Sequence, residues 1–300
     1  MTLAASPPAF DLAGLSLKYP GGATGLDRMT TQIPAGETVA VLGPSGSGKS
    51  TLLSVLGLLW DDTGASGTAL FHDGRNQYDL LRLRADQKAG LRAGAFGFVL
   101  QSNYLLPHFS NAENVGMPLA LHGWPAPARA EWVSALLRAE GVDPRGDLRK
   151  RANGPPRQVA GGQKQRFSVL RSVIADPLVV FADEPSSNLD PGSTAAMFDL
   201  LALWKAGTLF DKQRAAFAAH AKTSSVVRRW LAQGPPPTAR TLMLVCHDVQ
   251  TARRQGDRFL LLNQEHRLEV AFERSAWDDH ADTVERVLGL PPGAAGRDRA

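Results

Sequence analysis

The sequence predicts an α/β fold whose core is a mostly parallel sheet covered by helices on both faces. The first observation is a set of short apolar runs typical of buried strands, at residues 37–43, 177–183 and 241–248. The second is that helical patterns of apolar residues separate these runs. The third is a series of helical segments between residues 101 and 161, which interrupts the alternation and indicates an inserted helical subdomain.

The remaining segments are assigned by the same periodicities. Apolar and polar residues alternate in AFDLAGLSLKYP, from Ala9, which predicts an edge strand. Further strands are expected at GTALFHDG, AFGFVL, FLLLN and LEVAFE, and helices from Ser50, from Arg84, across residues 111–141 and from about Gly162. Residues 291–300, PPGAAGRDRA, are expected to form a disordered tail.

The composition excludes some classes of protein. Of 300 residues, 43% are hydrophobic and 21% charged, which excludes a chain disordered throughout. A net charge of +4 permits an anionic partner without requiring one. The single cysteine, Cys246, excludes an internal disulfide. The first basic residue is Lys18, unlike in a secretory signal, and the most apolar run, residues 51–60, is about half a membrane span. Any membrane span is therefore expected in another chain.

A phosphate-binding loop is the most specific motif. GPSGSGKST fits the pattern G-x-x-x-x-G-K-[ST], between an expected strand and an expected helix. Its glycines allow backbone N–H groups to face phosphate oxygens, the lysine reaches the β- and γ-phosphates, and the Ser50 hydroxyl binds Mg²⁺. The expected nucleotide-binding residues are Gly43, Pro44, Ser45, Gly46, Ser47, Gly48, Lys49, Ser50 and Thr51.

An acidic pair follows the strand VVFAD. Asp183, at the strand end, is expected to hold Mg²⁺ beside the phosphate loop. Glu184 is expected to polarise the attacking water. Alone, the pair also fits a surface-facing acidic turn; together with the phosphate loop it predicts a nucleotide-hydrolysing site.

Residues 159–166, VAGGQKQR, resemble the LSGGQxQR signature of the ATP-binding cassette (ABC) superfamily. The other motifs occur in that family's order, namely GPSGSGKST, FVLQ, ADEP, NLD and CHD. The resemblance covers about residues 9–270, and residues 97–119 resemble the branch that serves lipoprotein release, macrolide export and cell division. It implies a P-loop NTPase fold of ABC type, with an N-terminal antiparallel β portion.

The resemblance also implies a mechanism. Two nucleotide domains, from identical or related chains, sandwich two ATP molecules between the phosphate loop of one and the signature of the other. Tyr19 matches the aromatic that stacks on adenine, although an edge-strand aromatic is the alternative. Gln101 matches a Mg²⁺-contacting residue that senses the membrane partner, His247 a switch near the γ-phosphate, and Asp190 a residue that couples the two sites. The signature residues expected at the nucleotide are Ala160, Gly161, Gly162 and Gln163.

The sequence departs from the family pattern in two places. Ala160 stands where the family usually has a serine that donates to the γ-phosphate, so slow but not absent hydrolysis is expected. The interval from Asp190 to His247 is about twice the usual length and contains an extra basic helical insertion at about residues 207–240. Between Lys205 and Arg240, seven Lys or Arg residues stand against one Asp, a net charge of +6. This segment fits either a solvated surface helix or a docking surface for anionic lipid headgroups or a partner's acidic patch.

The expected function is an ATP-binding and ATP-hydrolysing subunit that powers a separate integral membrane permease. One ABC domain over residues 1–290 is expected, with a helical subdomain at about residues 102–162, on the inner face of the cell membrane through its permease. The alternative is a soluble ABC ATPase acting in nucleic-acid, translation or metallocluster chemistry, although no specific nucleic-acid partner is expected. A small-molecule kinase is disfavoured because it has no need of the signature segment.

Overall fold

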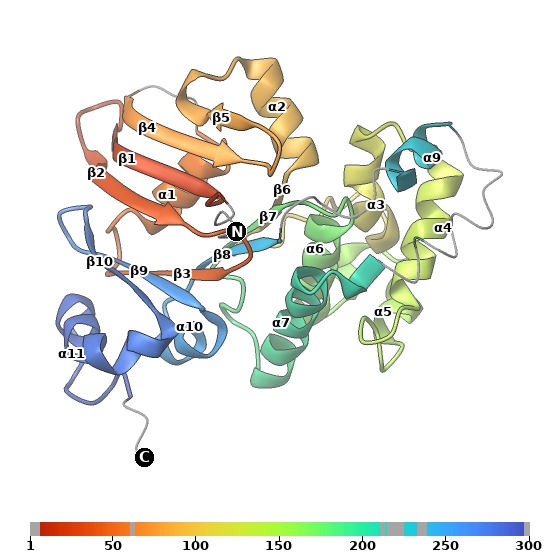
Figure 1. Ribbon diagram of the computed structural model, residues 1–300. Helices are drawn as coiled ribbons and strands as arrows, with labels where there is room; N and C mark the ends of the chain where they lie inside the picture. Colours follow the sequence, from red (N-terminus) through yellow and green to blue (C-terminus); the bar gives the residue numbers. More distant parts are fainter. Residues whose placement is uncertain (1–6, 61–63, 211–213, 215–224, 233–238, 297–300) are drawn as a thin grey trace, which may run out of the picture. The chain divides into compact units, whose positions relative to one another are not determined.

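The computed structural model describes residues 7–60, 64–210, 214, 225–232 and 239–296. The chain forms two compact units, coloured by sequence in Figure 1. Unit 1 takes in the described residues up to Arg92, the segment Phe181–Glu184 and the described residues from Thr241 on. Unit 2 takes in the described residues of Ala93–Val180 and Pro185–Arg240, and so includes the segment 102–162 expected to be a helical subdomain.

An antiparallel sheet forms the first part of unit 1. Its strand order is β2-β1-β4-β5, with bounds Thr24–Ile33, Phe10–Lys18, Ala65–His72 and Gln77–Asp79. The expectation of an edge strand from Ala9 is therefore wrong, because β1 pairs with β2 on one side and β4 on the other. The alternation of apolar and polar residues shows that one face of a strand is buried. It does not show whether other strands pair with that strand on one side or on both.

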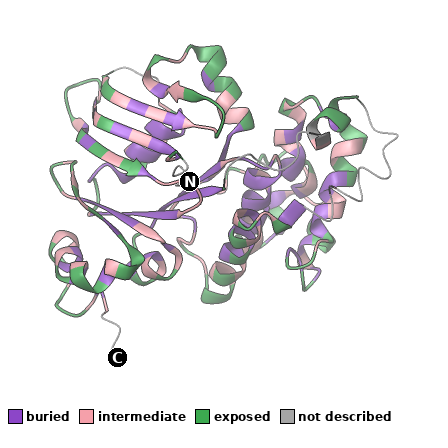
Figure 2. Cartoon of the chain, viewed as in Figure 1, coloured by how far each residue is buried: buried purple, intermediate pink, exposed green. Residues whose placement is uncertain are grey.

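The second sheet has the strand order β10-β9-β3-β8-β7-β6. The central strand β3 pairs in parallel with β8 and with β9, and β10 pairs antiparallel with β9. Every residue of β3 and of β8 is buried, as Figure 2 shows in purple, which explains their uninterrupted apolar sequences. The mostly parallel α/β core is therefore confirmed. The bounds are β3 Thr38–Leu42, β6 Phe96–Val99, β7 Val179–Asp183, β8 Thr241–Val245, β9 Arg258–Leu262 and β10 Leu268–Glu273.

Among its described residues, unit 1 has four helices and two 3-10 turns besides the strands. They are α1 Lys49–Leu56, α2 Ala85–Gly94, which ends just past the unit boundary, α10 Val249–Gln255, α11 Trp277–Leu288, and turns at Leu80–Arg82 and Arg274–Ala276. The chain continues past α11 in packed structure. Ala295 is fully buried, its N–H donates to Glu285 Oε1 at 3.0 Å, and its carbonyl accepts from Trp277 Nε1 at 3.3 Å. The expectation of a disordered tail is thus wrong for residues 291–296, while residues 297–300 lie outside the described part.

Unit 2 is mainly helical. Its helices are α3 Asn111–Leu121, α4 Ala126–Leu137, α5 Asp147–Arg151, α6 Gly161–Val173, α7 Pro191–Lys205 and α9 Ser225–Ala232, with a 3-10 turn at Pro156–Gln158. A capping box starts α3, because Ser110 Oγ accepts from Glu113 N and the Glu113 carboxylate accepts from Ser110 N. The buried helix α6 contacts α3, α7 and β6 and is the centre of this unit.

The insertion after α7 is anchored within unit 2. Phe210 stacks on Trp132 with centroids 6.1 Å apart. The buried carboxylate of Asp176 accepts from Arg240 Nε and from Arg214 Nη2, both at 2.8 Å. Much of the basic segment 207–240 lies outside the described residues, but its helix α9 is described, and Val226 on α9 lies close to Gly123, between α3 and α4. No described helix combines the length and apolarity needed to cross a bilayer.

Candidate functional site

The loop between β3 and α1 packs tightly against the backbone of neighbouring segments. Gly48 has φ +98°, and a Cβ there would lie 2.3 Å from the Gly25 carbonyl oxygen. Gly43 has φ +156°, and its Cβ would lie 2.5 Å from Ser47 Oγ and 2.6 Å from the Leu262 carbonyl oxygen. Only glycine fits at these two positions. The loop delivers the chain directly into α1, so its backbone N–H groups and the positive end of the helix dipole face the same space.

Lys49 begins α1 and is almost completely buried. Its ammonium donates to the carbonyl oxygens of Gly43 and Pro44, at 2.8 and 2.7 Å. Burial lowers the pKa of Lys49, and the charges of Glu184 and Asp183 oppose that shift. The lysine therefore stands at the loop as a desolvated cation, a strong electrostatic partner for a phosphate.

Asp183 ends β7 and meets the first turn of α1. Ser50 Oγ donates to Asp183 Oδ1 at 3.2 Å. Burial raises the pKa of Asp183; the nearby Glu184 carboxylate adds to that rise, whereas Ser50 and Lys49 oppose it. A hydroxyl and a carboxylate oxygen in contact are the hard oxygen donors that Mg²⁺ prefers.

Glu184 follows in a left-handed conformation with φ +47°. Its N–H donates to the Val245 carbonyl oxygen at 3.0 Å, which fixes it to the end of the neighbouring strand β8. His247 comes from the residues after that strand, and its Nε2 lies 2.5 Å from Glu184 Oε1. The strand ends of β7 and β8 thus bring together two residues that lie far apart in the sequence.

Tyr19 lies at the same site, at the end of the β1–β2 sheet. Its hydroxyl is 2.6 Å from Thr51 Oγ1, and its ring meets Trp60 edge to face at a centroid distance of 5.0 Å. A pocket of about 330 Å³ joins this aromatic to the phosphate loop and to the acidic pair. Its lining residues are Tyr19, Thr24, Gly25, Ser45, Gly46, Gly48, Lys49, Ser50, Thr51, Glu184, His247 and His266.

Three of these residues carry no signal in the sequence. Thr24, Gly25 and His266 belong to no motif, and their spacing from the phosphate loop is arbitrary. Gly25 has no room for a side chain, because an added Cβ would lie 2.8 Å from the Tyr19 ring. The polar segment NQEHR between two apolar strands predicts an exposed turn around His266. Nothing in that pattern predicts that the turn lies at the phosphate loop.

The other expected site residues belong to unit 2. Gln101 is exposed in the loop after β6, and Ala160 is the N-cap residue of α6. Gln163 accepts from Ala160 N at 3.3 Å, which is one half of a capping box; the other half requires a side-chain oxygen that alanine lacks. An added Cβ on Gly162 would lie 2.2 Å from Ser193 Oγ, so glycine is required where α6 meets α7.

Asp190 has a local structural role in the same unit. It is the N-cap residue of α7, where Oδ1 accepts from Ser193 N at 2.9 Å and Oδ2 accepts from Ser193 Oγ at 2.6 Å. These hydrogen bonds lower the pKa of the Asp190 carboxyl. Its suggested part in coupling two nucleotide sites stays a prediction.

Comparison with known proteins decides the family. The family model described as "ABC transporter" matches residues 26–187, more than half of the chain. The chain belongs to the ABC transporter family. Family membership identifies this ABC chain as an ATP-binding ATPase, as the sequence predicts, and confirms the P-loop NTPase fold of ABC type.

Several relatives belong to the expected branch. The chain is 38% identical over 197 residues to the lipoprotein-releasing system ATP-binding protein LolD of Hyphomonas neptunium, and the match covers 65% of this chain and 81% of that protein. It is 35% identical over 292 residues to the macrolide export ATP-binding/permease protein MacB of Rhodospirillum rubrum, covering 96% of this chain and 37% of MacB. It is 41% identical over 198 residues to the pyoverdine export ATP-binding/permease protein PvdT of Pseudomonas syringae pv. tomato, covering 65% of this chain and 28% of PvdT.

A solved structure supports the same assignment. The dimeric ATP-binding cassette MJ0796, in a post-hydrolysis state bound to ADP and Pi, superposes with a TM-score of 0.68 at 25% identity. The superposition covers 88% of this ABC chain and 98% of that cassette. The chain spans 81% of LolD, but only 28% of PvdT and 37% of MacB.

Proposed function

We propose that this ABC chain is the ATP-hydrolysing subunit that powers a separate integral membrane permease, at the inner face of the cell membrane. One observation carries the proposal: the chain covers 81% of LolD, a protein that is itself an ATP-binding protein of a lipoprotein-releasing system. The residues that line the pocket support ATP hydrolysis, and the exposed apolar side chains of unit 2 support binding to a permease.

ATP and Mg²⁺ fit the residues of the pocket. Lys49 supplies the buried cation, the loop supplies N–H donors without Cβ obstruction, and Ser47 Oγ is a buried hydroxyl with no partner among the described residues. Ser50 and Asp183, in contact at 3.2 Å, would hold Mg²⁺. A contact of Gln101 with the metal is carried over from the family resemblance alone. When bound, the metal neutralises charge that develops on the transferring phosphoryl group.

Glu184 is the proposed general base for the attacking water. Its backbone is anchored to β8. The Glu184 carboxylate lies close enough to Lys49 for its charge to act on the pKa of the lysine. His247 contacts the same carboxylate at 2.5 Å and would orient it toward the γ-phosphate. Tyr19 completes the site as the platform for adenine.

The signature at the start of α6 is proposed to face the phosphate loop of a second nucleotide domain, of an identical or related chain. Gly161 and Gly162 offer backbone N–H groups at a helix N-terminus, while Ala160 offers no hydroxyl. The loss of one hydrogen bond to a charged oxygen weakens binding by roughly 1.5–3 kcal/mol, or about ten- to a hundred-fold. Hydrolysis is therefore slow and not abolished, since Glu184 and His247 are both in place.

Exposed apolar side chains of unit 2 are the proposed docking surface for a cytoplasmic helix of the permease. Tyr104, Leu106 and Phe109 follow β6, with exposed fractions of 66%, 42% and 39%, and Leu121, at the end of α3, is 73% exposed. Leu105 and Met117 are half-buried beside them. Such a set of large apolar side chains on one segment marks a protein-binding surface.

Co-purification tests this function. The chain is produced with the membrane proteins encoded beside it, and the membranes are solubilised and purified through a tag on the chain. We expect a protein with several membrane spans to be retained. Leu106→Glu with Leu121→Glu should abolish retention, while Leu59→Glu, at a leucine of unit 1 that is 49% exposed, should not. A chain that stays entirely in the soluble fraction would favour the soluble ABC ATPase instead.

A further inference from the structure

The turn between β9 and β10 places a histidine at the nucleotide pocket. His266 lines the pocket of about 330 Å³ together with Lys49, Ser45 and Gly46 of the phosphate loop. It lies outside every motif of the site. Its carbonyl oxygen accepts from Asp27 N at 2.9 Å, which ties the turn to β2.

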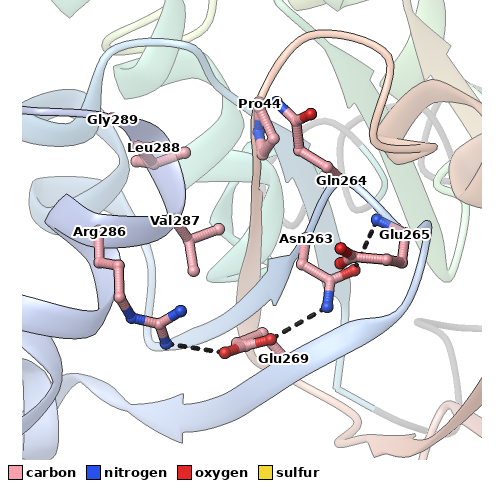
Figure 3. A pocket seen from close by; sticks show the side chains of 9 residues that line it. All are labelled: Pro44, Asn263, Gln264, Glu265, Glu269, Arg286, Val287, Leu288 and Gly289. Atoms are coloured by element: carbon pink, nitrogen blue, oxygen red, sulfur yellow. Dashed lines mark hydrogen bonds and ion pairs between the residues drawn. The ribbon is translucent and has the colours of Figure 1, made fainter.

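The backbone of His266 is held in an unusual conformation. Its φ is +61°, in the left-handed region that favours glycine or asparagine. Asn263 stabilises the turn, because its Oδ1 accepts from Glu265 N and Arg267 N, both at 3.1 Å. In Figure 3, Asn263 Nδ2 donates to Glu269, at 3.0 Å, and Arg286 donates to the other oxygen of Glu269, at 2.8 Å.

His266 and the other residues of this turn line different pockets. Asn263, Gln264 and Glu265 line a different pocket, of about 380 Å³, together with Pro44 and the end of α11 (Figure 3). A second tie comes from Arg267 Nε, which donates to Asp27 Oδ2 at 2.6 Å. The turn is therefore a built scaffold that presents one side chain, His266, to the phosphate-loop pocket.

The two ring nitrogens of His266 differ in their surroundings. Nδ1 is buried and has no hydrogen-bond partner among the described residues. Nε2 is not buried and forms no hydrogen bond with a described residue, which leaves it as the nitrogen that can reach a molecule in the pocket. An imidazole N–H is a good donor to an anionic oxygen, and the neighbouring loop already provides a field that favours negative charge.

We propose that His266 is a further nucleotide-binding residue, which donates a hydrogen bond from Nε2 to a phosphate oxygen of the bound nucleotide. The proposal rests on the proposed ATP site in this pocket and adds a contact from outside the motifs. It predicts that the imidazole contributes to affinity only for ligands that carry phosphate.

Equilibrium binding of ATP and of adenosine, by competition with a fluorescent ATP analogue, tests the proposal. His266→Gly removes the ring and suits φ +61°, so the fold is preserved and thermal unfolding should be unchanged. We expect about a ten-fold loss of ATP affinity and no change in adenosine affinity. His266→Asn, which also tolerates this φ and retains an N–H donor, should recover part of the loss.

Two control variants separate the possible failures. Gln264→Gly makes the same kind of change in the same turn outside the nucleotide pocket and should bind ATP as the parent does. Lys49→Ala should lose ATP binding; if it does not, the proposed ATP site itself is wrong. If Lys49→Ala loses binding while His266→Gly binds ATP like the parent, the His266 contact is wrong. An equal loss for ATP and adenosine would assign His266 to the nucleoside and overturn the phosphate contact.

Discussion

His247 Nε2 lies 2.5 Å from Glu184 Oε1, and this contact joins the residues that follow β8 to the residue that follows β7. The Glu184 side chain is 16% exposed, whereas that of His247 is 54% exposed. The imidazole thus covers one oxygen of a partly buried carboxylate. Glu184 and His247 both line the pocket that also contains Lys49 and the phosphate loop.

Glu184→Gln is expected to separate binding from hydrolysis. The amide has the size of the carboxylate and still accepts a hydrogen bond from His247, but it cannot take a proton from water. ATP affinity should stay within about three-fold of the parent, while phosphate release falls by about a hundred-fold or more. With ATP, the variant should accumulate as a dimer in size-exclusion chromatography. Glu131→Gln, on exposed surface of α4, is the control; turnover of Glu184→Gln at the parental rate would reject Glu184 as the base.

Ala160→Ser is expected to act on both stability and turnover. A serine at the N-cap of α6 accepts from the backbone N–H of Gln163 and completes the capping box, which stabilises the fold by about 1 kcal/mol. Its hydroxyl also adds a phosphate donor, so we expect a several-fold rise in the ATPase rate or in ATP-driven dimerisation. Denaturant unfolding and phosphate release measure the two effects.

Ala160→Gly distinguishes these effects. Glycine is a better N-cap residue than alanine but has no hydroxyl. If serine and glycine raise the ATPase rate equally, the gain comes from the helix terminus and not from a phosphate contact. If neither changes the rate nor the dimerisation, the explanation of slow turnover by Ala160 is to be dropped.

Asp176→Ala is expected to destabilise unit 2. The Asp176 side chain is 2% exposed and is paired with Arg240 and Arg214, which are 9% and 13% exposed. Removing one partner of a buried ion pair leaves charge that the interior does not solvate, so the loss should be about 3–5 kcal/mol. Urea unfolding measures this value. Asp86→Asn breaks an exposed pair with Arg84 and should change stability by less than about 0.5 kcal/mol; similar losses for both variants would show that the Asp176 cluster has no special weight.

Asp147→Asn is expected to change the acid sensitivity of the signature region. Burial acts to raise the pKa of Asp147, but the hydrogen bond from Gln163 and the charge and hydrogen bonds of Arg166 lower it to about 2. A carboxyl whose folded pKa is below its unfolded value stabilises the fold above the unfolded pKa and loses that contribution as pH falls through the folded pKa. The parent should exceed Asp147→Asn in stability by about 1–2 kcal/mol at pH 7. Between pH of about 4 and 2 the difference should vanish, and a difference independent of pH would contradict this explanation.

The strand assignments illustrate what a sequence pattern contains. Uninterrupted apolar runs predicted β3, β7 and β8 as buried parallel strands, because strands covered on both faces leave no position for a polar side chain. The alternation in β1 gave its buried face correctly but not its two neighbours. The tail after α11 was misjudged because the buried Ala295 and its bonds to Trp277 and Glu285 depend on a helix that the pattern did not reveal.

The sequence by itself determined the phosphate loop, the acidic pair and the family, since these are local arrangements of backbone and side chain that few other residue orders permit. Their assembly into one pocket depends on strand ends that meet at one edge of a sheet. The order of the family motifs along the chain already implied this assembly. Only the tertiary structure decided that Tyr19 contacts Thr51, that His247 covers Glu184 and that His266 joins the pocket. These contacts join residues that lie far apart in the sequence. Their geometry depends on strand register and on a turn with φ +61°, and neither feature produces a periodic pattern of residues.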